Sequence, residues 1–124
     1  MFLTRPLSVL LLGALASASC LAVAASAKVQ SEIDGLLGNL QSSGCEFNRN
    51  GTWHSPSEAK AHLQRKREYL EGKGLIKSAE DFITLGASES SSSGKAYLVR
   101  CGSGPAVASR IWLLQQLDRL RQGK

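Results

Sequence analysis

The chain has 124 residues, 43% of them hydrophobic, and a formal net charge of +5 at pH 7. This length holds one domain with a single modest core, and we expect no second domain. The charge is mild, and its one basic cluster, residues 65–67, is far smaller than the basic stripe of a nucleic-acid-binding protein. We therefore expect no nucleic-acid partner.

The first 27 residues follow the pattern of a signal peptide. Arg5 precedes a short apolar run over residues 7–15, and small residues lead from this run to Ala25-Ser26-Ala27. This order predicts cleavage before Lys28, with the segment 22–24 as an alternative site. The apolar run is too short for a membrane span, which needs about 20 residues.

Cleavage would decide the compartment of the mature chain, residues 28–124. We expect this chain in the periplasm, with no stable membrane span and a net charge of +4, because the leader holds one of the 15 basic residues and none of the ten acidic ones. A lipid anchor on Cys20 is the alternative. Ser17 stands where such lipid sites usually have leucine, so we favour cleavage near Ala27.

Two cysteines, Cys45 and Cys101, remain in the mature chain. In an oxidising compartment a count of two allows a single pairing, so we expect a Cys45–Cys101 disulfide rather than two free thiols. Neither cysteine has a histidine or a further cysteine nearby at zinc-finger spacing, so we expect no metal site, and no cofactor.

The mature chain begins with a helix and a hairpin. Apolar residues at helical spacing predict an amphipathic helix over residues 29–41 that ends at Gly44. These residues are Val29, Ile33, Leu36, Leu37 and Leu40. Strand-like alternation over 45–49, the turn pair Asn50-Gly51 and a short return over 52–54 predict a β-hairpin.

Capping residues mark the next two helices. Ser55 reads as an N-cap, with Pro56 at the first helical position and Glu58 completing a capping box, which predicts a helix over residues 56–71. Glycines then stop this helix, and Ser78 starts a short third helix that carries Phe82, Ile83 and Leu85.

The last third contains a loop, a strand and a helix. Residues 88–94 form a serine-rich loop, which we call the serine loop, and residues 96–101 read as a strand that Cys101 would join to the strand at Cys45. A final helix over 106–122 is predicted to bury one apolar face, formed by Val107, Ile111, Leu113, Leu114, Leu117 and Leu120. The whole predicts an α+β domain of about four helices and a small antiparallel sheet.

Five ordered motifs resemble the YfeK-type family, a domain of unknown function in small periplasmic bacterial proteins. They are Phe47-x-Arg49-Asn50-Gly51, Glu58-Ala59-x-x-His62-Leu63-x-x-Lys66, Ser78-Ala79-Glu80-x-Phe82-Ile83, Ala87-Ser88 and Ser93-Gly94-Lys95-x-Tyr97-x-Val99. The resemblance covers roughly residues 33–99 and implies the periplasm and a single domain. It implies no reaction, and the cysteine pair is not part of the pattern.

Ionisable residues on the second predicted helix suggest a binding site. His62 and Lys66 share the side that faces the core, with Tyr69 on the same stripe, and ionisable groups seldom face inward without a partner. With Arg49 they can form a basic recess for a carboxylate, a phosphate or a peptide terminus. The candidate ligand-binding or partner-binding residues are Arg49, Asn50, His62, Lys66, Tyr69, Ser93 and Lys95.

A purely structural role for the same residues is the alternative. Lys66 would then lay its stem along the core, and His62 would bond to a backbone carbonyl of the serine loop. Arg110 lies in the apolar arc of the last helix, where an ion pair with Glu32 or Asp34 is expected.

The two tryptophans, Trp53 and Trp112, lie off the apolar stripes or near turns. Exposed together they would mark a partner surface, and otherwise one or both cap the edge of the core.

Catalytic motifs are weak in this chain. The segment 86–95 fails as a phosphate-binding loop, because Ser91 replaces the second glycine and Ala96 the magnesium-binding hydroxyl. We assign no catalytic residue and expect a binding module for an envelope protein or a small anionic ligand. The alternative is a hydrolase-like enzyme that uses His62 and a serine of residues 88–93, with Glu58 to orient the imidazole. The oligomeric state is left open.

Export is testable directly. Expressed with its leader in a Gram-negative bacterium, the protein is expected in the osmotic-shock fraction with Lys28 as its first residue and no alkylation of Cys45 or Cys101 without reduction. N-terminal sequencing and intact-mass spectrometry check both points. A retained leader, or two free thiols in the exported protein, would contradict the expectation.

Overall fold

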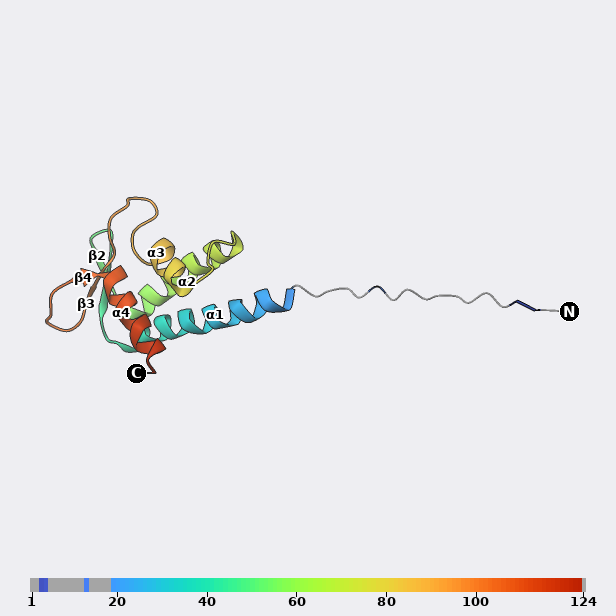
Figure 1. The fold of residues 1–124 in the computed structure, drawn as a ribbon. Helices are drawn as coiled ribbons and strands as arrows, with labels where there is room; N and C mark the ends of the chain where they lie inside the picture. The colour runs from blue at the N-terminus through green and yellow to red at the C-terminus, as the bar shows by residue number, and fades with distance from the viewer. Residues whose placement is uncertain (1–2, 5–12, 14–18, 124) are drawn as a thin grey trace.

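The computed structural model describes residues 3–4, 13 and 19–123 (Figure 1). The apolar run of the predicted leader lies outside these residues except for Gly13, and so does the side chain of Cys20. In chain order the elements are α1 (Ser19–Ser42), β1 (Glu46–Arg49), β2 (Thr52–His54), α2 (Pro56–Gly72), α3 (Ala79–Gly86), β3 (Leu98–Arg100), β4 (Val107–Ala108) and α4 (Ser109–Arg121). Four helices and one small sheet in the described part confirm the predicted α+β fold.

The sheet is antiparallel, with the strand order β2-β1-β3-β4. β1 and β2 form the predicted hairpin, and Asn50 and Gly51 have φ values of +53° and +84°, as this two-residue turn requires. β3 is shorter than the predicted strand 96–101. Tyr97 lies outside it, because its N–H donates to Ser88 O while its C=O accepts from Ser109 N.

α1 is the helix on which the other three pack. It contacts α2, α3 and α4, and its N-terminal part extends beyond them while the sheet lies near its C-terminal end (Figure 1). α1 begins ten residues before the predicted start at residue 29, so cleavage before Lys28 would leave residues 28–42 as the mature helix. None of the described helices is long and apolar enough to cross a membrane.

The core lies between the helices and one face of the sheet. Its largest fully buried apolar side chains are Tyr97, Phe47, Phe82, Ile33, Leu36, Leu37, Leu40, Leu63, Ile83, Leu113 and Val99. Every helix contributes to this core, and so do the two central strands, β1 and β3. Tyr97, which directly precedes β3, also belongs to it. The predicted stripe of α1 is confirmed at Ile33, Leu36, Leu37 and Leu40, while Val29 is half-buried at its edge.

The start of the last helix differs from the prediction. Val107 and Ala108 pair with β3, so α4 begins at Ser109 rather than at residue 106. Backbone pairing in the sheet thus determines the helix start, and the buried face becomes Ser109, Trp112, Leu113 and Leu117. Val107 and Ile111, which were predicted to be buried, are exposed.

The ion pair expected for Arg110 is not formed, and Trp112 lies on the buried face of the last helix. Arg110 is exposed and does not pair with Glu32 or Asp34, because these carboxylates bind Arg121 and Arg67 instead. Trp112 is buried in the core.

Trp53 lies under Arg100, whose guanidinium carbon is 4.0 Å from the ring centroid. With Trp112 in the core, the tryptophans cap edges of the fold and form no exposed pair.

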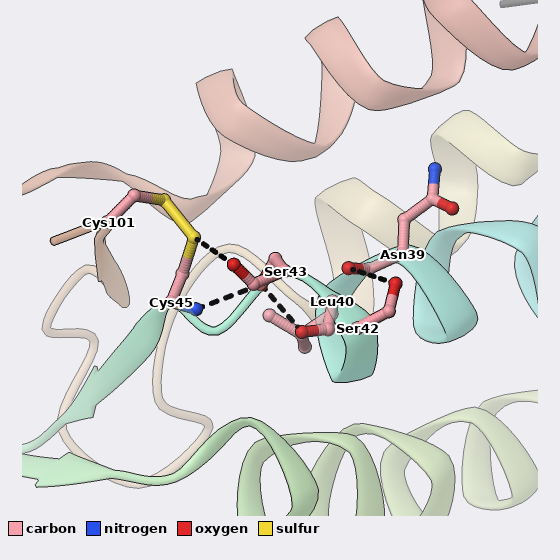
Figure 2. The surroundings of a disulfide bond; sticks show 6 residues. All are labelled: Asn39, Leu40, Ser42, Ser43, Cys45 and Cys101. Carbon is pink, nitrogen blue, oxygen red and sulfur yellow. Dashed lines mark hydrogen bonds between the residues drawn. A yellow bond between two sulfur atoms is a disulfide. The ribbon is translucent and has the colours of Figure 1, made fainter.

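The predicted disulfide between Cys45 and Cys101 is present, with an S–S distance of 2.05 Å (Figure 2). The register of β1 and β3 explains this disulfide. Glu46 lies opposite Arg100, so Cys45, which precedes Glu46, and Cys101, which follows Arg100, also lie opposite each other. Ser43 orders the approach to β1, because its hydroxyl donates to Leu40 O and accepts from the Cys45 N–H (Figure 2). The end of α1 and both strands are therefore fixed at one point.

The disulfide should supply much of the stability of this small domain. Replacing Cys45 with Ala and Cys101 with Ser is expected to lower the free energy of unfolding by about 4 kcal/mol, because the cross-link closes a long loop in the unfolded chain. Urea denaturation of the mature chain measures the loss. The wild-type protein treated with a reductant is the control and should lose the same amount; a loss below about 1 kcal/mol in both would contradict the prediction.

Candidate functional site

A buried tyrosine stands at the centre of the candidate site. Tyr97 is 1% exposed, and its ring packs against Phe47 with centroids 5.0 Å apart. Its backbone is held on both sides, by Ser88 O and by the first N–H of α4 at Ser109. The Tyr97 hydroxyl therefore has a fixed position beneath α2.

Two residues of α2 meet this hydroxyl. His62 and Lys66 are four residues apart, so they lie one above the other on the same face of the helix. His62 Nε2 and Lys66 Nζ each lie 3.1 Å from the Tyr97 hydroxyl oxygen, and Lys66 Nζ also lies 4.9 Å from the ring centroid. Lys66 donates a further hydrogen bond to Glu89 O in the serine loop.

Arg49 determines which form of His62 is present. Arg49 Nη1 lies 3.1 Å from His62 Nδ1, and a guanidinium can only donate, so Nδ1 accepts and Nε2–H donates to Tyr97. Burial, and then the nearby positive charges of Arg49 and Lys66, lower the pKa of His62 to about 4. His62 is therefore neutral near pH 7. Burial also lowers the pKa of Lys66 below its usual value, although the Glu89 carboxylate opposes this shift.

Arg49, His62, Arg65 and Lys66 form what we call the basic cluster. Within residues 19–123, no carboxylate oxygen lies within 4.0 Å of the Arg49, Arg65 or Lys66 cations. The neighbouring Glu58 instead binds His54 and Ser55, and these hydrogen bonds lower its pKa. The cluster thus keeps three positive charges without a direct counter-ion.

Two recesses flank the basic cluster, and His62 and Arg65 line both. A recess of about 230 Å³ lies between the hairpin and α2, with Arg49, Phe47 and Glu58 in its lining. We call it the hairpin recess.

A second recess of about 390 Å³ is lined by residues of α2 and α3 together with Ser91 of the serine loop. We call it the α3 recess. Lys66 lines only the α3 recess, Arg49 lines only the hairpin recess, and Arg65 lines both.

The other predicted site residues have different places. Asn50, Ser93 and Lys95 line neither recess. Asn50 donates to Ser90 Oγ and accepts from Ser93 Oγ, which ties the hairpin turn to the serine loop, and the Lys95 N–H donates to Ser93 Oγ. These three residues support the loop beside the site, and we assign them no ligand contact.

The face that α2 buries was predicted incorrectly. Tyr69 is 66% exposed rather than core-facing, and it forms an outer wall of the α3 recess. Arg67 is buried in its place, because Asp34 and Glu71 accept hydrogen bonds from its guanidinium. The paired charge allows the helix to turn Arg67 inward between α1 and α2.

In the structural alternative, His62 was expected to bond to a backbone carbonyl of the serine loop, and a different residue makes this bond. Lys66, and not His62, binds a carbonyl of the serine loop. Sequence reasoning missed Tyr97 as the shared partner and Arg65 as a lining residue. The quoted motif contained Tyr97, but its contact with His62 joins residues 35 positions apart in the chain, which local patterns do not predict.

A groove larger than either recess lies elsewhere in the fold. It has a volume of about 670 Å³ and lies between the C-terminal end of α1 and α4, with Asn39, Trp112 and Gln116 in its lining. Its charged residues, Asp118 and Arg119, have opposite signs. We place the candidate site by unbalanced charge rather than by size, and therefore at the basic cluster. Among the described residues, no three potential metal ligands gather.

Comparison with known proteins gives a family but no activity. A model described as a family of unknown function (DUF5329) matches residues 27–121, which include the sheet, the disulfide and the basic cluster. No curated protein matches the chain, and no solved structure does. Function must therefore be argued from the geometry of the site.

The low pKa of His62 predicts a pH dependence of stability. Unfolding raises this pKa from about 4 to its usual 6.5, so the unfolded chain takes up a proton first and stability falls as the pH drops from 6.5 towards 4. Between pH 7 and pH 5 we expect a loss of about 1 kcal/mol, after allowing for solvent screening of this half-buried ring.

Urea denaturation of wild type and His62→Gln at pH 7 and pH 5 measures this contribution. The His62→Gln variant should lack it, whereas His54→Gln, which removes the histidine outside the cluster, should retain it. Equal pH dependence in wild type and His62→Gln would show that His62 titrates alike in the folded and unfolded chains.

Proposed function

The chain belongs to this family of unknown function, DUF5329, and we propose that it is an exported module that binds a small anionic group at the basic cluster. The observation that carries the proposal is the set of three cations without a direct carboxylate partner around a neutral histidine. Like charges held together repel one another, and a bound anion would relieve that repulsion.

The free donors of the cluster suit a carboxylate or a phosphate. Arg49 uses Nη1 for His62, which leaves its other N–H groups for a ligand. Arg65 is exposed between the two recesses and can bind an anion through two parallel hydrogen bonds. Lys66 has one donor left after Glu89 O and Tyr97. Each recess thus offers an anion two cationic side chains, Arg49 and Arg65 in the hairpin recess and Arg65 and Lys66 in the α3 recess.

In this proposal His62 and Tyr97 act as positioning residues. Tyr97 holds His62 and Lys66 from below, and His62 holds Arg49 through Nδ1. Because His62 stays neutral, it bonds to Arg49 and Tyr97 without adding a fourth positive charge to the cluster. The cluster is thereby arranged before a ligand arrives, which reduces the entropy lost on binding.

An anionic group fits both expected kinds of partner. A small ligand and an acidic side chain or C-terminus of an envelope protein present the same carboxylate. The hydrolase alternative finds less support, because both ring nitrogens of His62 are engaged by Arg49 and Tyr97. A serine nucleophile of the serine loop would need one of these nitrogens as its base.

Export is part of the proposal and has three supports. The leader pattern, the disulfide and the resemblance to the periplasmic YfeK-type family all favour an oxidising compartment outside the cytosol. The match to DUF5329 begins at Ala27, next to the predicted cleavage site.

Anion binding is testable with simple probes. Acetate and inorganic phosphate, titrated into the oxidised mature chain at low ionic strength, should shift the amide NMR signals of residues around the basic cluster, and added sodium chloride should weaken binding. Changing Arg65 and Lys66 together to Gln should weaken binding at least about tenfold, since each removes a charged donor.

A matched control keeps the net charge equal. Lys77→Gln with Arg110→Gln removes two exposed cations away from the cluster and should leave the affinity unchanged. Thermal unfolding of both double variants checks that the fold is retained. Equal weakening by the two pairs, or shifts spread over the whole surface, would overturn the proposal.

A further inference from the structure

The α3 recess combines charge with exposed apolar side chains. His62, Arg65 and Lys66 line one part of it, while Tyr69, Leu70 and Leu85 line the other. Tyr69 is 66% exposed and Leu85 47% exposed, so two large apolar side chains face solvent beside the cations. Leu70, which is buried, lies between them in the lining.

The backbone of the fold builds this apolar part. Positions 62, 65, 66, 69 and 70 lie on successive turns of one face of α2, so the polar and apolar parts follow each other along the helix over about 12 Å. Gly86 lets α3 approach, because a Cβ there would lie 3.0 Å from Leu70 Cδ1. This close approach places Leu85 opposite α2.

The Tyr69 ring is held as a wall of the recess. Lys73 Nζ lies 5.7 Å from its centroid, a contact that favours one orientation of the ring. Leu75 is also exposed, at 48%, but it lies in the connection after α2 and does not line the recess. Tyr69 and Leu85 are thus the exposed apolar side chains that adjoin the basic cluster, while Leu75, Val107 and Ile111 are exposed elsewhere.

We infer that the α3 recess binds an amphiphilic carboxylate, with its charged head at Arg65 and Lys66 and its apolar part against Tyr69, Leu70 and Leu85. This inference rests on the proposed anion binding and adds the class of ligand. Charge complementarity identifies the head, since the cations of the recess have no carboxylate partner within 4.0 Å in the described part of the chain. Burial of Tyr69 and Leu85 under an apolar chain supplies the rest of the affinity.

A series of straight-chain carboxylates tests the inference. The affinity of the oxidised mature chain for acetate, butyrate, hexanoate and octanoate, measured by NMR titration, should rise about twofold to fourfold for each added methylene. Octan-1-ol has the same chain without the charge, and it should bind at least about tenfold more weakly than octanoate.

Variants separate the apolar part from the charged part. Changing Tyr69 and Leu85 together to Ala should remove the dependence on chain length, so that octanoate binds the variant no more tightly than acetate does. Leu75→Ala is the control for the loss of an exposed leucine outside the recess, and it should keep the affinities of the whole carboxylate series. Because Tyr69 and Leu85 are exposed, the double variant is expected to fold, and thermal unfolding verifies this.

The outcomes distinguish the two proposals. If acetate binds and chain length has no effect, or if the double variant keeps the full series, the inference fails while anion binding stands. If neither acetate nor octanoate binds, the inference fails, and if inorganic phosphate does not bind either, anion binding fails with it. A tighter affinity for N-acetylleucine than for hexanoate would assign the carboxylate to a peptide C-terminus, and the reverse order would assign it to an acyl chain.

Discussion

The hydroxyl of Tyr97 is the contact on which the basic cluster depends. Buried phenol groups need a hydrogen-bond partner, and this one is shared by His62 and Lys66 on consecutive turns of α2. Through His62 it also fixes Arg49 of β1. One buried oxygen thus joins the sheet to the helix. Burial of His62 at this point, and then the charges of Arg49 and Lys66, lower its pKa.

Local patterns in the sequence predicted most of the fold. The spacing of Ile33, Leu36, Leu37 and Leu40 predicts the buried face of α1, and the turn Asn50-Gly51 predicts the hairpin, because each depends on neighbouring residues alone. The start of α4 depends instead on the pairing of Val107 with Val99 in the preceding strand. A helical pattern contains no information about that pairing.

The site was predicted only in part for the same reason. The sequence brings His62 and Lys66 to one face of a helix, and their partner Tyr97 is 31 residues beyond Lys66. The orientation of α2 depends on Arg67, whose burial needs Asp34 from α1. A helical wheel treats this arginine as exposed. It therefore assigns Tyr69 to the buried face of the helix, although the ring is exposed.

The strand β1 lies between two fixed points. Cys45 at its beginning is joined covalently to Cys101, and Arg49 at its end bonds to the imidazole of His62. Only three residues separate Cys45 from Arg49, so an extended strand cannot absorb a shift at either point. Under the proposed anion binding, the Cys45–Cys101 bond would therefore affect the basic cluster through β1. A preparation with reduced cysteines would then contain fewer molecules able to bind the anion.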